Sequence, residues 1–325
     1  MRTDRETIGR RALSCGELLE QYRASSVHEE GRKLMFGGVG DRDVYNITAP
    51  FADEGELVIA GRVEPRDSQF SKVLFFVQRD GRWVPRPGSR AFELQDPFVS
   101  KVGERLVFGG VRVIVSPEQP GKIVSWVTEF YEGASIADLK PLCTGPDHMK
   151  DIRLVGLRDG GIGVFTRPQG ALGGRGTIGY IRIHSLAELS AETILQAELF
   201  KDQFLPEEWG GANEVHLLDS GLIGVLGHIA CIDAMKRKHY YPMAFVFDPS
   251  NGRRTGIRLI AERRQFPAGP CKREDLADVI FSGGLIRGMD GQATLYAGIS
   301  DAEAHTLVIP DPFLAYERDE IPQLQ

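Results

Sequence analysis

The sequence predicts an all-β fold, a five-bladed β-propeller, that forms a single domain over residues 1–325. Many short apolar runs are separated by glycine and proline, of which the chain has 38 and 18. This punctuation is typical of sandwiches, barrels and propellers. Helical periodicity is scarce, and a degenerate repeat occurs five times. A β-sandwich is the alternative fold.

The expected strands are short, and turn residues bound several of them. Asp80-Gly81, Asn251-Gly252 and Asp290-Gly291 each lie beside an apolar run and favour tight turns. The segments that most clearly predict strands are residues 33–39, 57–63, 73–78, 106–115, 162–166, 178–183, 222–228, 243–247 and 294–299.

Each copy of the repeat is an apolar strand that ends in a small residue and leads into a polar cluster. The copies read LVIAGRVEPRD, RLVFGGVRV, GIGVFTRPQG, GLIGVLGHIA and TLYAGISDAE. They lie about 50 to 70 residues apart, roughly the length of a four-stranded blade with one long loop. We expect these copies to be the innermost strands of five blades, with their polar ends in a shared central funnel.

Only two segments have helical periodicity, residues 12–22 and 185–199. The first belongs to an expected N-terminal helical extension of about residues 1–25. Both are interpreted as helices that pack on the surface of the β domain.

Composition excludes several functions. A net charge of −6 argues against a protein that captures nucleic acid, although a locally basic pocket for a small anion is compatible with it. No apolar run has the length of a signal peptide or a membrane span, so we expect a cytoplasmic protein without a membrane partner.

No cofactor or metal is predicted. The four cysteines, at positions 15, 143, 231 and 271, form no CxxC pair and are interpreted as reduced thiols. No pair of histidines has the spacing of a catalytic zinc site. Glycine-rich stretches at Gly37, Gly170 and Trp209 lack the context of a phosphate-binding loop, and we interpret them as turns.

Two segments carry candidate carboxylates. Arg62, Glu64 and Asp67 follow an expected strand closely, and strand alternation places Arg62 and Glu64 on one face. They are candidate substrate-binding residues, or else a solvated strand edge. Asp96 precedes a proline at the entrance to the next expected blade. It is either the catalytic acid or an Asp-Pro turn.

Three cations lie near strand ends further along the chain. Lys150 and Arg153 precede one expected strand, and Arg167 follows the next. If they converge on one funnel they form a phosphate site, because phosphate needs several charge-assisted donors. A surface charge cluster is the alternative.

A fourth group combines an aromatic ring with hydrogen-bonding side chains, namely Trp209, Asn213, Glu214 and His228. This mixture suits the apolar face and the hydroxyl groups of a sugar. A structural role for a histidine is the alternative.

In order along the chain, these segments resemble the mannoside phosphorylases and hydrolases of glycoside hydrolase family 130. They resemble more closely the domain of unknown function 1861 family, which includes the mannosyltransferases and phosphorylases of glycosyltransferase family 108. The likeness runs from about residue 44 to residue 301 and is carried by VYNITAPF, AGRVE, QDPF, DHMKDIRL, VFTRP and YAGISDAE. Gln95 and Phe98 depart from the charged residues that flank Asp-Pro in family 130, and Thr166 stands where some phosphorylases have histidine.

The resemblance implies a five-bladed propeller that holds a β-mannoside in its central cavity, with Asp96 as the acid of an inverting displacement. It also implies that Lys150, Arg153 and Arg167 hold phosphate, and that Asn46 and Asp301 belong to the sugar-binding site. Partial burial is expected to raise the pKa of Asp96, as an acid near neutral pH requires.

The leading hypothesis is an inverting phosphorylase or mannosyltransferase acting on β-1,2-linked mannose. Its partners are a mannoside, mannose 1-phosphate or a nucleotide sugar, and inorganic phosphate. An inverting hydrolase is the first alternative, and needs a second carboxylate about 6.5 to 9.5 Å from the acid. Glu64, Glu214 and Asp301 are candidates for that role. A noncatalytic carbohydrate-binding propeller is the second alternative.

Overall fold

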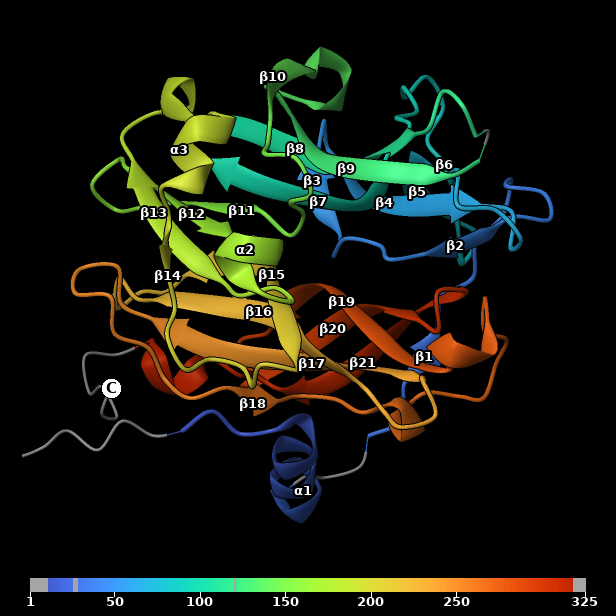
Figure 1. Ribbon diagram of the computed structural model, residues 1–325. Helices are drawn as coiled ribbons and strands as arrows, with labels where there is room; N and C mark the ends of the chain where they lie inside the picture. The colour runs from blue at the N-terminus through green and yellow to red at the C-terminus, as the bar shows by residue number, and fades with distance from the viewer. Residues whose placement is uncertain (1–10, 26–28, 120, 318–325) are drawn as a thin grey trace, which may run out of the picture.

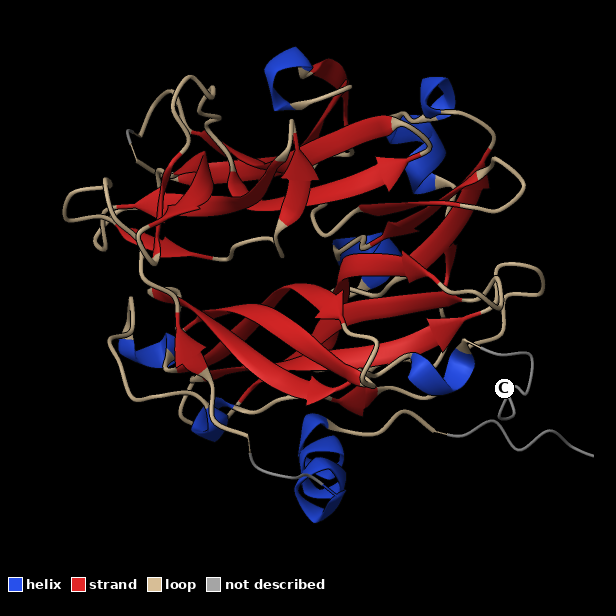
Figure 2. Ribbon diagram, turned by 180° about the vertical axis from the view of Figure 1, so that it is seen from behind, coloured by secondary structure: helices blue, strands red, loops and turns tan. Residues whose placement is uncertain are grey.

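The computed structural model describes residues 11–25, 29–119 and 121–317. Strands form most of the described structure, and the helices are few and short; α1 and α3 lie at the periphery, whereas α2 lies near the middle of the view (Figures 1 and 2). The sequence-predicted fold class, mainly β, is confirmed. None of the described helices is long and apolar enough to cross a membrane.

The strands form five successive antiparallel units. The first unit consists of β2 (Asp43–Tyr45), β3 (Phe51–Asp53), β4 (Glu56–Glu64), β5 (Lys72–Arg79) and β6 (Arg82–Pro85). The second consists of β7 (Gln95–Val102), β8 (Arg105–Val115), β9 (Ile123–Gly133) and β10 (Lys140–Thr144). The third consists of β11 (Arg153–Gly156), β12 (Ile162–Thr166), β13 (Gly179–Ile183) and β14 (Glu198–Leu199).

The last two units join into one eight-stranded sheet through a short parallel pairing of β17 with β19. The fourth unit consists of β15 (Trp209–Leu217), β16 (Ile223–Ile232), β17 (Lys238–Phe247) and β18 (Arg258–Leu259). The fifth consists of β19 (Asp278–Arg287), β20 (Gln292–Ile299), β21 (Glu303–Pro310) and the N-terminal strand β1 (Arg32–Lys33). The two ends of the chain therefore meet in one sheet.

Five buried apolar clusters connect these units into a closed ring. Phe75 of the first unit packs with Phe108 of the second, and Phe130 of the second packs in one cluster with Val164 of the third. Further clusters join the third unit to the fourth and the fourth to the fifth. The last cluster brings Ala304 of the fifth unit against the first. Because each sheet buries both faces against its neighbours, the ring has a continuous core.

The five repeat copies fall one in each unit, but not where we expected them. They form β4, β8, β12, β16 and β20, the second strand of each unit, whereas β2, β7, β11, β15 and β19 come first. The prediction that the copies are innermost strands is therefore wrong. A second strand is paired on both sides and buried on both faces, which explains why its apolar and small residues stand out in the sequence.

Two expected segments differ in detail. Only Arg32–Lys33 forms a strand near the segment 33–39, and Phe36 then makes an isolated bridge to Trp83. The expected helix over 185–199 divides into a 3₁₀ turn η2 (Leu186–Glu188), the short helix α3 (Ala191–Leu195) and strand β14. The helix expected over 12–22 is α1 (Cys15–Ser25), which lies outside the ring beside β18 (Figure 1). Residues 1–10 of the expected helical extension lie outside the described residues.

The remaining helical turns are short. They are α2 (Gly170–Gly173), η1 (Ile136–Asp138), η3 (Arg263–Gln265), η4 (Glu274–Leu276) and η5 (Leu314–Tyr316).

Bulges interrupt the first strand of three units. The register shifts between Gln95 and Phe98 in β7, between Ala212 and Glu214 in β15, and between Ser282 and Gly284 in β19. A bulge inserts one residue and turns the following side chains to the other face. These three bulges lie where the inner strands meet, and they help to decide which side chains enter the central space.

Candidate active site

Side chains from or next to strands of all five units converge on a cavity of about 260 Å³ at one end of the ring. Its lining is rich in charged side chains, although the whole chain has a net charge of −6. The cationic members are Arg62, Lys150, Arg167, Lys238, Lys272 and Arg273. The acidic members are Asp96 and Asp301. This cavity is therefore a locally basic site suited to a polar or anionic small molecule.

Asp96 lies deep in this cavity, where only 5% of the residue is exposed. Its Oδ1 accepts hydrogen bonds from Asn46 Nδ2 at 2.8 Å and Arg62 Nη1 at 3.1 Å. Its Oδ2 lies 4.0 Å from Lys150 Nζ. One carboxylate oxygen is thus held by two donors, and the other faces a single flexible cation.

Four residues at this end of the ring have left-handed backbone conformations. Their φ values are 44° for Asn46, 46° for Asp96, 60° for Asp151 and 51° for Asp301. Asparagine and aspartate tolerate this region better than most residues, but such conformations still cost energy. The fold holds these residues in strained backbone conformations, as is common where a ligand or substrate is bound.

Burial alone would raise the pKa of Asp96, as the sequence analysis expected. The charges of Arg62 and Lys150 and the hydrogen bonds from Asn46 and Arg62 outweigh burial and lower the pKa to about 2. The expectation of a raised pKa is therefore wrong. Asp96 is an ionised carboxylate at neutral pH.

Asp301 behaves in the opposite way. Desolvation raises its pKa above the usual range, the charge of Asp96 acts in the same direction, and Arg62 and Lys272 oppose both. The pKa values of two carboxyl groups that share one cavity are thus shifted in opposite directions.

Glu64 lies behind the cavity wall rather than in it. It is buried and accepts hydrogen bonds from Tyr45, Lys272 and Arg62, the last at 3.1 Å from Nη2 to Oε2. Arg62 therefore bridges Glu64 and Asp96. Both oxygens of Glu64 accept hydrogen bonds from these groups, so Glu64 positions Arg62 and Lys272 and has no free oxygen directed at a ligand.

Arg167 is buried beside the third and fourth units. Its Nη1 lies 3.3 Å from Asp151 Oδ2, and its Nε donates to the carbonyl oxygen of Gly210 at 2.9 Å. The close approach depends on Gly211, because a Cβ there would lie 2.8 Å from Asp151 Oδ2. The glycines after Trp209 thus belong to strand β15, and Gly211 makes room for this ion pair, so our interpretation of them as turn residues is wrong.

His228 lines the same cavity and is neutral. Burial lowers its pKa to about 3, against the opposing charge of Asp151. Its Nδ1 lies 2.8 Å from Asn213 Oδ1, which also accepts a hydrogen bond from Ser282 at 3.1 Å. Asn213 therefore holds the imidazole of His228 in a fixed orientation.

The structure does not bring Arg153 into the cavity with Lys150 and Arg167. Its guanidinium donates to the carbonyl oxygens of Asn213 and Ile152 at 2.6 and 2.9 Å and stacks 4.4 Å from the centre of the Phe98 ring. These contacts use its donors on the protein itself. Of the three cations expected to share one anion, only Lys150 and Arg167 line the cavity.

Trp209 supports the cavity from behind. Its Nε1 donates to the hydroxyl of Tyr240 at 3.2 Å, and Tyr240 lines the cavity. Asp67 is exposed in the loop after β4 and does not line the cavity.

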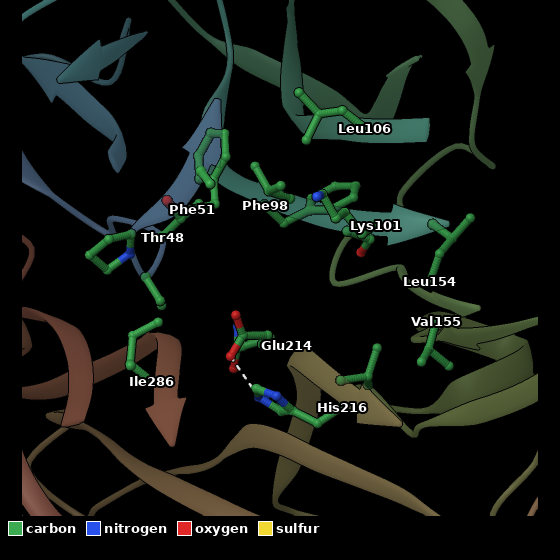
Figure 3. A pocket seen from close by; sticks show the side chains of 18 residues that line it. Thr48, Phe51, Phe98, Lys101, Leu106, Leu154, Val155, Glu214, His216 and Ile286 are labelled. Atoms are coloured by element: carbon green, nitrogen blue, oxygen red, sulfur yellow. Dashed lines mark ion pairs between the residues drawn. The ribbon is translucent and has the colours of Figure 1, made fainter. Parts of the chain in front are cut away.

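Glu214 lies in a different cavity, of about 300 Å³, between β3, β7, β11, β15 and β19 (Figure 3). Its Oε2 is 2.8 Å from His216 Nε2 and accepts the Leu285 amide at 2.7 Å. The bulge next to Ala212 turns Glu214 away from Asp96 and towards this second cavity.

Sequence reasoning missed several residues of the first cavity, namely Gln69, Gln95, Lys238, Tyr240, Lys272 and Arg273. Lys272 and Arg273 come from a charged segment between β18 and β19 that no strand pattern marks. Only the fold brings that segment over the cavity.

A protein family model described as a protein of unknown function, DUF1861, matches residues 20–315. The chain belongs to the DUF1861 family. No curated protein matches it.

Two solved structures of similar proteins come from Leishmania mexicana. One is MPT-4, a mannose phosphorylase in complex with phosphate ion, with 33% identity, a TM-score of 0.86, and coverage of 95% of this chain and 96% of that one. The other is MPT-1, a GDP-Man-dependent mannosyltransferase, with 32% identity, a TM-score of 0.86, and coverage of 94% and 98%. This DUF1861 chain is thus similar over nearly its whole length to two mannose-transferring enzymes.

A more distant likeness extends to a structure described under the GH130 family of mannoside phosphorylases, with 12% identity and a TM-score of 0.57 over 93% of this chain and 99% of that one. The β-1,2-mannobiose phosphorylase from Listeria innocua shares 13% identity with a TM-score of 0.60 over 90% of this chain and 94% of that one. At this identity the likeness shows the fold alone. The DUF1861 chain therefore has the fold of family 130, as the sequence resemblance implied.

Proposed function

We propose that this protein transfers a mannosyl group between a mannoside and inorganic phosphate, with inversion at the anomeric carbon. The observation that carries the proposal is a buried aspartate, Asp96, in a cavity that also presents the cations Lys150 and Arg167. The similarity to a mannose phosphorylase and a mannosyltransferase supports mannose as the transferred sugar. The linkage that we propose is β-1,2.

In the phosphorolytic direction, a phosphate oxygen forms a bond to the anomeric carbon while the glycosidic bond breaks. Asp96 donates a proton to the leaving oxygen, and the proton that hydrogen phosphate loses replaces it. A phosphate ion bound between Lys150 and Arg167 would partly neutralise the charge of Lys150, which lowers the pKa of Asp96. Binding of phosphate thus prepares Asp96 to carry the proton.

In the synthetic direction the same group acts as a base. The carboxylate of Asp96 takes the proton of the acceptor hydroxyl. The hydroxyl oxygen forms a bond to the anomeric carbon of mannose 1-phosphate while the bond from that carbon to phosphate breaks. The low pKa of Asp96 keeps it ionised, which is the form that this step requires.

An inverting hydrolase needs a second carboxylate that acts as a base on water. Glu64 is bonded to Tyr45, Lys272 and Arg62, and Glu214 faces the other cavity. Asp301 shares the cavity with Asp96 and is the remaining candidate for this base. The cations Lys150 and Arg167, which suit a phosphate nucleophile, are the reason to propose phosphorolysis rather than hydrolysis.

A nucleotide sugar is a second candidate donor. Lys238 and Arg273 line the same cavity, and both pair with Asp275, at 3.6 and 2.9 Å. Two cations share one carboxylate, which leaves net positive charge for a second phosphate group. The similarity to a GDP-Man-dependent enzyme also supports this donor.

For the architecture, we propose that the five antiparallel units are the blades of a single five-bladed β-propeller. Its support is the closed series of five apolar clusters between successive units. Pairing of β1 with β21 would then close the ring between the first and last blades.

The experiment that tests the function incubates the purified protein with mannose as acceptor and either mannose 1-phosphate or GDP-mannose as donor. Release of phosphate or of GDP identifies the donor, and the NMR spectrum of the disaccharide gives the linkage. We expect release of phosphate and a β-1,2 product. Binding of mannosides without turnover of either donor would contradict the proposal and support a noncatalytic sugar-binding protein.

A further inference from the structure

Two cysteines that are far apart in the sequence meet outside the candidate active site. Cys15 is the first residue of α1, Cys231 lies in β16, and Glu208 immediately precedes β15. Both sulfur atoms and a carboxylate oxygen of Glu208 lie within 4.8 Å of one another. None of the three residues lines the Asp96 cavity. We refer to Cys15, Glu208 and Cys231 as the thiol cluster.

The thiol cluster is buried and one of its atoms lacks a partner. Cys15 is 2% exposed and Glu208 is 7% exposed. Glu208 Oε1 accepts a hydrogen bond from the Cys15 amide at 2.7 Å, whereas its Oε2 has no hydrogen-bond partner among the described residues. No described lysine or arginine forms an ion pair with Glu208 within 4 Å. A buried carboxylate oxygen without a partner is costly.

We propose that the thiol cluster binds a Zn²⁺ ion. Two thiolates and one carboxylate are ligands that zinc favours, and their ligand atoms lie close enough together to bind one ion. Cys231 is half-buried, so water can reach the fourth position. Binding releases the two thiol protons to solvent and gives Glu208 Oε2 its missing partner.

The place of the cluster in the fold indicates what the ion would do. Cys15 comes from α1, which lies outside the ring, whereas Glu208 and Cys231 belong to the fourth unit. Coordination would therefore fix the N-terminal helix to the ring (Figure 1). This is a structural role, and it does not depend on mannosyl transfer.

A Cys15–Cys231 disulfide is the competing use of these thiols. A disulfide would form no bond with the carboxylate that lies beside both sulfur atoms, and it would leave Glu208 Oε2 without a partner. The position of Glu208 is the reason why the cluster favours a cation.

The test uses Co²⁺ as a spectroscopic probe, added to the reduced full-length protein without oxygen. We expect one Co²⁺ per chain, with thiolate-to-cobalt absorption that Zn²⁺ abolishes. Cys15→Ser and Cys231→Ser should remove this absorption, and Glu208→Gln should weaken Co²⁺ binding at least about tenfold. Cys143→Ser and Cys271→Ser are the matched controls, and they should bind as the parent does.

A second measurement needs no variant and so does not depend on folding of the substituted proteins. Zn²⁺ should slow alkylation of Cys15 and Cys231 by iodoacetamide, without slowing that of Cys143 and Cys271. Mass spectrometry of the labelled peptides reports each site. Equal labelling rates with and without Zn²⁺, or cobalt absorption that persists in Cys231→Ser, would overturn the proposal. A Cys15–Cys231 disulfide that forms equally fast in excess Zn²⁺ would also overturn it.

Discussion

Asp96 is ionised because its neighbours stabilise the charged form. Arg62 and Asn46 bind one oxygen, and Lys150 faces the other. Arg62 is itself held by Glu64, so its position is fixed, whereas the Lys150 side chain is about one-third exposed. Lys150 is therefore the cation most able to move onto a bound anion.

Replacing Lys150 tests this assignment. Lys150→Met keeps the length of the side chain but removes its charge, and a hydrogen bond between charged groups contributes about 1.5–3 kcal/mol. We expect the KM for phosphate to rise about 10- to 100-fold, with a smaller change in the KM for the mannoside. Steady-state kinetics with each substrate varied in turn measures both values.

Lys101→Met is the matched control, because Lys101 is exposed beside the other cavity. It should leave both KM values unchanged. Equal increases in the two KM values of Lys150→Met would contradict a specific phosphate role for Lys150.

The low pKa of Asp96 also predicts how stability depends on pH. Its pKa is about 2 in the folded protein, below the ordinary value of 3.8. The ionised group therefore stabilises the fold above about pH 4, and this contribution is lost as the pH falls towards 2. Its size is on the order of 2 kcal/mol.

Urea unfolding between about pH 5 and pH 2 measures this effect. The parent should lose more unfolding free energy over this range than Asp96→Asn, which cannot titrate. Parallel losses in the two proteins would show that the pKa of Asp96 is not lowered.

Much of the site could be predicted at the scale of single residues. Asp96 was expected to be the catalytic acid, the other six residues were expected to bind substrate or phosphate, and all seven line one cavity, namely Asn46, Arg62, Asp96, Lys150, Arg167, His228 and Asp301. Their roles remain proposals. The direction of the Asp96 pKa shift was missed, because it depends on how closely Arg62 and Lys150 approach in space. The thiol cluster was missed for the same reason, since 216 positions separate its cysteines, from 15 to 231.

At the scale of elements, the bulges explain which predictions failed. Simple alternation along β15 cannot predict to which face Asn213 and Glu214 point, because the bulge after Ala212 reverses the faces to which the following side chains point. The repeat copies are strands, as predicted. Because they are the second strands of their units, they contribute side chains to the cavity mainly from their ends. Arg62, Arg167, His228 and Asp301 come from four of the five copies.

Gly211 in β15 offers a test at this scale. A Cβ there would lie 2.8 Å from Asp151 Oδ2 and 3.0 Å from Arg167 Cδ, so Gly211→Ala should displace this ion pair. We expect weaker phosphate binding, by about tenfold or more, because Arg167 loses its position. Isothermal titration with inorganic phosphate measures the affinity.

Gly256→Ala is a suitable control, because a Cβ at Gly256 would meet no atom within 4 Å. Its affinity for phosphate should equal that of the parent. Unchanged affinity in Gly211→Ala would show that the Asp151–Arg167 pair does not contribute to the anion site.

At the scale of the whole molecule, the fold depends on closure of the ring. Strand β1 pairs with β21, Lys33 forms an ion pair with Glu303, and the Leu34 amide donates to the carbonyl oxygen of Ala304 at 2.9 Å. The mainly β class and the number of units followed from turn residues and the repeat. This closure could not be predicted, because a two-residue strand leaves almost no pattern in the sequence.

Truncation tests the contribution of β1. A chain that begins at residue 35 lacks both α1 and β1, whereas a chain that begins at residue 26 lacks α1 alone. We expect the first to unfold several degrees lower than the second, because β21 loses its partner strand. Calorimetry of the two truncated proteins gives the comparison, and equal Tm values would contradict a stabilising closure.

The central claim is that Asp96 carries the proton in mannosyl transfer, and Asp96→Asn tests it most directly. The amide keeps the size of the side chain but cannot exchange this proton, and general acid–base catalysis contributes about 10²- to 10⁴-fold. We measure phosphate release from mannose 1-phosphate with mannose as acceptor, and the exposed Asp67→Asn is the control. The account predicts that Asp96→Asn loses at least about 10²-fold in kcat while it remains folded and binds mannose, and that Asp67→Asn keeps full turnover. Turnover by Asp96→Asn within a few-fold of the parent would contradict the account, and Asp301 would then be the next acid to test.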